Sequence, residues 1–122
     1  MLQHGYADCG SAAIATYDLL RGRTDSLREL SDELGTSELG TAINDMQRVL
    51  ASRLGRPVII VQTRLSSLSR DDLPIIMWHA GHFTVVTSKD DTIEILDPWF
   101  GDLITNDAKV RQWNVLVLRP QG

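Results

Sequence analysis

The stretch HFTVVTSKDDTIEILD, residues 82–97, decides the fold of this chain. Residues 82–87 alternate in part between apolar and polar side chains, and residues 92–95 alternate cleanly, which is typical of strands with one buried face. The polar residues 89–91 between them are predicted to form a hairpin turn. Because a hairpin joins antiparallel strands, this stretch predicts an antiparallel sheet.

The segments on either side of the hairpin differ in character. Further apolar runs that favour strands occupy residues 58–61, 74–78 and 113–118. Helix-forming composition, capping residues and apolar spacings of three and four predict helices at residues 9–20, 27–34 and 41–54. Because the helices come first and the strands follow as a block, the order favours an α+β fold with N-terminal helices on an antiparallel sheet.

Length and composition limit the class of protein. The chain has 122 residues, of which 43% are hydrophobic and 23% charged, so residues 1–122 are expected to form a single globular domain. No apolar run is long enough to span a bilayer and no signal peptide is visible, so membrane insertion is not expected. The formal net charge of −4 disfavours a nucleic-acid partner, because proteins that bind phosphate backbones are usually basic.

The single cysteine, Cys9, excludes an internal disulfide and a Cys-rich structural zinc site. It is either a small buried residue or a reactive thiol. Cys9 falls at the start of the predicted helix 9–20, directly after Asp8 as a candidate N-cap. Unpaired N–H groups and the helix dipole favour a thiolate there, which indicates chemistry more than packing.

A nucleophilic cysteine needs a base, and the chain offers His4, His79 and His82. His4 is too near Cys9 in sequence to come from an independent element. His82 opens a predicted strand, which is a rigid mount for a base. His79 ends the preceding strand, and any of these histidines can also be purely structural.

Asp97 is the candidate orienting group for the base, although an Asp-Pro pair is also a common turn initiator. If the hairpin pairs Thr87 with Thr92, His82 falls directly opposite Asp97, where side chains can touch. Gln3, six residues before Cys9, can reach back over the helix start and donate to an oxyanion.

These residues together carry a family resemblance. The chain resembles the papain-like cysteine peptidases, and within them the C39 family of bacterial double-glycine leader peptidases. The matching features are Gln3, Asp8-Cys9-Gly10-Ser11-Ala12-Ala13, Leu27-Arg28-Glu29-Leu30, Gly35-Thr36-Ser37, Gly40-Thr41, His82-Phe83-x-Val85-Val86, Asp97-Pro98 and Gly101.

The resemblance implies a small papain-like α+β domain and four functional residues. They are a Cys9 nucleophile, a His82 base, an Asp97 orienting group and a Gln3 oxyanion donor. It also implies cleavage of a protein or peptide substrate after a Gly-Gly pair, with no metal or organic cofactor.

The resemblance further implies a biological setting. C39 domains mostly precede a membrane-spanning, ATP-binding transporter. Papain-like domains also occur as toxin domains at the ends of bacterial secreted effectors. We therefore expect a domain excised from a longer protein, acting in the bacterial cytoplasm or as a toxin in a target cell's cytoplasm, where a cognate inhibitor or immunity protein would bind it.

Three alternatives remain at this point. A deamidase or transglutaminase can use the same residues, and product mass distinguishes it from a peptidase. A non-catalytic binding module can keep a papain-like shell, although it has no use for all four residues. A plain globular domain with a buried Cys9 is the third.

Overall fold

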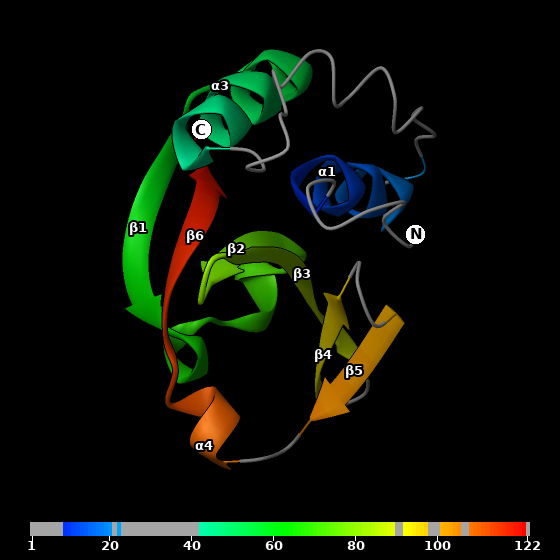
Figure 1. Ribbon diagram of the computed structural model, residues 1–122, viewed down its shortest axis with the longest axis vertical. Coiled ribbons are helices and arrows are strands. Elements are labelled where there is room, and N and C mark those ends of the chain that lie inside the picture. Colours follow the sequence, from blue (N-terminus) through cyan, green and yellow to red (C-terminus); the bar gives the residue numbers. More distant parts are fainter. Residues whose placement is uncertain are drawn as a thin grey trace.

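The computed structural model describes residues 9–20, 22, 42–89, 92–97, 101–105 and 108–121, and Figure 1 shows how its elements are arranged. Six strands form one sheet in the order β1-β6-β2-β3-β4-β5, and all neighbouring strands are antiparallel. The strands are β1 (Val58–Arg64), β2 (Ile75–His79), β3 (His82–Lys89), β4 (Thr92–Asp97), β5 (Gly101–Thr105) and β6 (Asn114–Pro120). Helices pack on this sheet, which confirms the predicted α+β class.

The first helix, α1 (Cys9–Leu20), has the predicted bounds. The helix α3 (Ile43–Leu54) begins two residues later than predicted, because Ala42 has extended backbone angles (φ −74°, ψ 146°). It ends as predicted at Gly55, whose left-handed backbone (φ 67°) lets its N–H donate to the Ala51 carbonyl at 2.9 Å. The predicted helix at residues 27–34 and the Asp8 cap lie outside the described residues.

The sequence analysis missed one strand and one short α-helix. Strand β5 adds to the outer edge of β4 through pairs such as Ile95 with Leu103, although it opens with Gly101 and Asp102, two residue types that are rare in strands. Its strand form comes from pairing with β4, which local composition does not report. The helix α4 (Ala108–Arg111) is a single turn and therefore too short to have a periodic signal.

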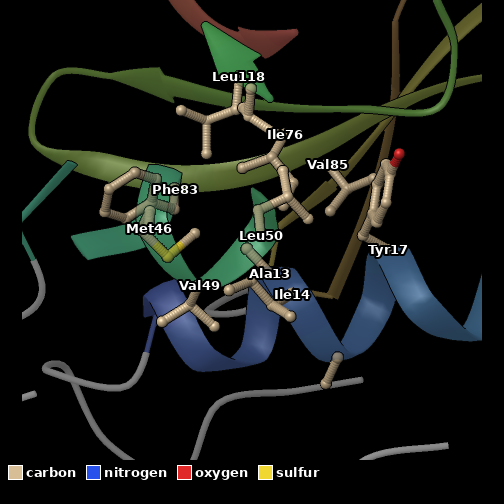
Figure 2. Packing of buried hydrophobic residues seen from close by; sticks show 12 residues of the cluster. Ala13, Ile14, Tyr17, Met46, Val49, Leu50, Ile76, Phe83, Val85 and Leu118 are labelled. Carbon is tan, nitrogen blue, oxygen red and sulfur yellow. The ribbon is translucent and has the colours of Figure 1, made fainter. Parts of the chain in front are cut away.

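Both faces of the sheet are covered by apolar side chains. Helices α1 and α3 pack on one face, as Figure 2 shows for Ile14 of α1, Leu50 of α3 and Val85 of β3. On the other face a second buried cluster, which includes Met77 and Val86, packs against partly buried side chains from α4 and the loops. The helix that begins at Cys9 is therefore seated directly on the central strands β2 and β3.

An ion pair also ties the two helices together. Arg53 Nε of α3 lies 3.5 Å from Asp18 Oδ2 of α1, and the Asp18 side chain is fully buried. None of the helices within the described part of the chain has the length and apolar character needed to cross a membrane.

Candidate active site

Cys9 is the first residue of α1. The N–H groups of a first helical turn have no partner within the helix, and the dipole stabilises negative charge at this end. The first turn of α1 contains no acidic residue that would oppose such a charge. A thiolate, the nucleophilic form of cysteine, therefore suits this position.

His82 is the first residue of β3 and is half-buried. It follows the two-residue turn Ala80-Gly81, in which both residues have positive φ (52° and 79°), the pattern of a type I′ hairpin turn. Beyond the turn, His82 pairs directly with His79 of β2. The turn and this pair fix the point at which β3 begins.

His79 has a different environment from His82. Its ring stacks on the Trp113 indole, with centroids 4.1 Å apart and an interplanar angle of 10°. A pocket of about 280 Å³ lies next to this stack, lined by Trp78 and His79 of β2 and by residues of β1 and β6. His79 thus packs against Trp113 just beneath the turn that leads into β3.

Asp97 is the last residue of β4, and its backbone pairs with Gly101 of β5. The predicted register of the β3–β4 hairpin is wrong by two residues. Val85 pairs with Leu96 and Lys89 with Thr92, so the next pair of this ladder would set Thr84, and not His82, opposite Asp97.

The cause of this error is the length of the turn. The predicted register left residues 88–91 as a four-residue loop, whereas Ser88 and Lys89 still pair with β4. Only residues 90 and 91 separate the strands, which is the commonest hairpin loop length. Because a shift of two residues keeps side-chain parity, a ladder extended past Val85 and Leu96 would still set His82 and Asp97 on the same face, as diagonal neighbours.

The starts of α1 and β3 lie at the same end of the molecule. In Figure 2, α1 runs from Ala13 to Tyr17 in the direction in which β3 runs from Phe83 to Val85, and all four side chains belong to one buried cluster. Cys9 begins the turn of α1 before Ala13, and His82 directly precedes Phe83. The structure therefore brings the helix start and the strand start to one end of their shared interface.

Alternation along β3 sets the side on which each residue lies. Phe83 and Val85 pack in the cluster with α1, whereas Val86 packs in the cluster on the other face. Because side chains alternate along a strand, the positions of Thr84 and His82 belong to the same face as Val86. Gln3, the fourth predicted site residue, lies outside the described residues.

Thr84 is a polar residue that the sequence analysis did not single out. It is 5% exposed, and its Oγ1 has no hydrogen-bond partner among the described residues. The sequence already shows Thr84 as a polar residue within the otherwise apolar run 83–86, which marks it as a polar side chain in a buried strand. No group of three or more metal-ligating side chains occurs in the described ranges.

One known protein family matches nearly the whole chain. The family model described as the Peptidase C39 family matches residues 1–121. The chain belongs to the Peptidase C39 family. It is therefore a cysteine peptidase, and the predicted family resemblance is confirmed.

Solved structures show the same fold. One is a double glycine motif protease from an AMS/PCAT transporter in complex with the leader peptide; it has a TM-score of 0.79 and 20% identity, with 99% of this chain and 90% of that chain covered. Another is the peptidase domain of Streptococcus ComA, a bifunctional ABC transporter involved in quorum sensing; it has a TM-score of 0.75 and 20% identity, with 99% and 97% covered. No curated protein matches the chain significantly in sequence.

Proposed function

We propose that this C39 peptidase cleaves peptide substrates after a Gly-Gly pair, with Cys9 as nucleophile and His82 as its base. The observation that carries the assignment is that Cys9 and His82 are the first residues of two elements that pack together and run in the same direction. A thiol at a helix start and an imidazole at a strand start are the two parts that thiol catalysis requires. Because His82 has the parity of the face away from α1, the proposal requires the two groups to meet at the end of the sheet, not across its face.

Asp97 has the role of orienting the His82 ring. Asp97 ends β4, and extending the β3–β4 register by one pair beyond Val85 and Leu96 would make it a diagonal neighbour of His82 on the same face. Diagonal neighbours in an antiparallel pair are about 7–8 Å apart, with their Cβ atoms somewhat closer, a span that a carboxylate and an imidazole can close with a hydrogen bond. A carboxylate there fixes the tautomer of the ring and stabilises its cation.

Gln3 completes the site as an oxyanion donor. The support for Gln3 is the match of the family model, which covers its position together with Cys9, His82 and Asp97. Its side-chain amide and the Cys9 backbone N–H would donate hydrogen bonds to the oxygen that becomes negative in the tetrahedral intermediate.

The reaction then proceeds by acyl transfer. The Cys9 thiolate attacks the scissile carbonyl carbon, and the His82 imidazolium protonates the leaving amine as the C–N bond breaks. His82, now neutral, takes a proton from water, which attacks the thioester carbonyl. The acid product leaves, and the Cys9 thiolate and His82 imidazolium are restored.

A Gly-Gly substrate fits the fold relatives, one of which is a double glycine motif protease solved with a leader peptide. Glycine lets a substrate backbone approach a nucleophile more closely than any residue with a Cβ. We expect the replacement of either substrate glycine by alanine to lower kcat/KM by at least about tenfold, or about 1.4 kcal/mol of transition-state stabilisation.

The test is incubation of the protein with a set of peptides that contain Gly-Gly, Gly-Ala, Ala-Gly or Ala-Ala at one site, read by mass spectrometry. Two fragments whose shared end follows the second glycine support the proposal. Equal cleavage of the Ala-Ala peptide would reject the double-glycine preference and leave a peptidase of other specificity. An uncut peptide with altered mass would indicate deamidation or transglutamination.

The effector role, the immunity partner and the cellular location predicted from the sequence stay predictions. The peptide assay addresses the chemistry of the site and is independent of them.

A further inference from the structure

Strand β1 is the last strand on one side of the sheet. It pairs with β6 along its inner edge, and no described strand pairs with its outer edge, which Figure 1 shows at the left margin of the molecule. Residues 58–63 contain no charged residue, proline or glycine, the residue types that usually guard an exposed edge. The outer edge of β1 is therefore open to a further strand.

The hydrogen bonds at the two ends of β1 show which of its backbone groups point outward. The Gln121 N–H donates to the Pro57 carbonyl at 2.8 Å, the Leu65 N–H donates to the Trp113 carbonyl at 3.0 Å, and both pairs continue the β1–β6 register. Because hydrogen-bonded and non-bonded pairs alternate along an antiparallel ladder, residues 59, 61 and 63 bond to β6. The N–H and C=O groups of residues 58, 60, 62 and 64 therefore point to the outer edge.

The two ends of this outer edge differ from its centre. Gln47 Nε2 of α3 donates to the Val58 carbonyl at 2.7 Å, and Thr63 Oγ1 donates to the Arg64 carbonyl at 3.3 Å. Within the described part of the chain, no hydrogen bond engages the N–H or the carbonyl of Ile60 or Gln62. These groups form a short ladder that lacks its other strand.

Cations flank the centre of this edge. Arg64 closes β1 and Arg56 precedes its first residue by two positions; both are exposed, and neither forms an ion pair with another described residue. Asp71 and Asp72 line a pocket together with Arg56, but Asp72 lies 3.8 Å from Arg119. A strand with an acidic residue toward each end would complement the edge in both hydrogen bonding and charge.

The same features argue against two other occupants. Antiparallel pairing of two copies of β1 about Val61 would bring Arg64 of each copy within two positions of Arg56 of the other, which is unfavourable. Strands β6 and β2 separate β1 from β3, which carries His82, so at about 4.8 Å per strand an added strand would lie roughly 19 Å from β3. This separation favours a partner other than the substrate.

We propose that the outer edge of β1 binds an extended, acidic segment of a partner protein, which adds to the sheet as a further strand. The Ile60 and Gln62 N–H groups donate to carbonyls of the segment, and their carbonyls accept from its N–H groups. Alternate apolar side chains of the segment pack beside Ile59, which is 42% exposed, and Val61, on the face away from α3. Main-chain bonds supply affinity, and the two flanking arginines select acidic ends.

The first test uses a short synthetic peptide of alternating Val and Thr with Glu at each end, and the same peptide with Lys at each end. Amide hydrogen exchange, read residue by residue by NMR, reports the edge directly. We expect the Glu-ended peptide to slow exchange at Ile60 and Gln62 by at least about tenfold, and to leave Val61, which already bonds to β6, unchanged. The Lys-ended peptide should have little effect.

Three outcomes would overturn the proposal. No added protection with either peptide would mean that the two arginines only guard the edge. Protection at Ile60 and Gln62 that grows with protein concentration in the absence of peptide would identify a second copy as the occupant. Inhibition of Gly-Gly cleavage by the Glu-ended peptide would make β1 part of the substrate site.

A matched pair of variants tests the main-chain bonds. Gln62→Pro removes the outward N–H and leaves the β6 ladder intact, whereas Gln62→Thr keeps that N–H and is the control. We expect Gln62→Pro to weaken binding of the Glu-ended peptide by at least about tenfold and Gln62→Thr to change it by less than about twofold, measured by fluorescence anisotropy. Equal affinities would reject strand addition, and if Gln62→Pro does not fold, the exchange pattern of the unchanged protein decides.

Charge reversal tests the selection of acidic ends. The double variant Arg56→Glu with Arg64→Glu should prefer the Lys-ended peptide over the Glu-ended one, and added salt should reduce the preference. An unchanged preference for the Glu-ended peptide would show that the arginines do not select the partner.

Discussion

The three predicted site residues that the structure describes all lie at the boundaries of elements. Cys9 opens α1, His82 opens β3 and Asp97 closes β4. An element boundary combines a rigid mount with access to solvent, which is what a reacting side chain needs. This is why capping residues, turn residues and strand patterns, read together, pointed to these positions from the sequence.

At the residue scale, His82 and His79 should differ sharply. His82→Ala should lower kcat/KM on a Gly-Gly peptide by at least about a hundredfold, because it removes the general base. His79→Ala should leave turnover within about twofold. It should cost about 1 kcal/mol of stability through loss of the stack on Trp113. Steady-state kinetics and urea unfolding of both variants check this, and an inactive His79→Ala with an active His82→Ala would reverse the assignment.

At the scale of elements, the sequence predicted strongly patterned segments well and pairing-dependent features poorly. The bounds of α1 and β4 match the prediction because composition, capping and alternation are local signals. Strand β5 and the β3–β4 register depend on which backbone groups meet, and the pattern around residues 88–91 was compatible with a four-residue or a two-residue loop. The register differs from the predicted one by two residues, so the recorded pairs do not set Asp97 opposite His82.

The turn before β3 gives a prediction at this scale. Gly81 has φ +79° and Gly55, after α3, has φ +67°, and an added Cβ would meet no atom within 4 Å at either position. Gly81→Ala and Gly55→Ala should therefore each cost about 1 kcal/mol, from backbone strain alone.

Only Gly81→Ala should also lower kcat, because its turn sets where His82 begins β3. Unfolding curves and kcat values for the two variants, measured side by side, check this. Equal kcat values would show that the turn does not position His82.

At the scale of the whole molecule, α1 is held by the sheet beneath it and by α3 beside it. Figure 2 shows side chains of α1, α3 and the central strands meeting in one cluster. The buried Asp18–Arg53 pair adds a charged link between the two helices. The sequence predicted both helices but not this link, because no local pattern marks a pair of charges 35 positions apart in the chain.

This link predicts a large difference between two arginines of α3. Arg53→Ala should destabilise the protein by about 3 kcal/mol, because the fully buried Asp18 carboxylate loses its Arg53 partner. Arg48→Ala is the control: Arg48 is 60% exposed and lies 3.7 Å from Asp45, also exposed, so its loss should cost less than about 0.5 kcal/mol. Urea unfolding compares them, and similar midpoints would mean that the Asp18–Arg53 pair contributes little.

The central claim is that Cys9 is the nucleophile that attacks the carbonyl after a Gly-Gly pair. Its most direct measurement is the intact mass of the protein after incubation with a peptide that ends in Gly-Gly and carries a thiol-reactive electrophile in place of the scissile bond. Because the chain contains one cysteine, a covalent adduct identifies the residue without ambiguity. The account predicts one adduct per chain, abolished in Cys9→Ala and strongly slowed in His82→Ala, while an Ala-Ala probe labels slowly. No adduct on the folded protein, or equally fast labelling of the His82→Ala variant by both probes, would contradict it.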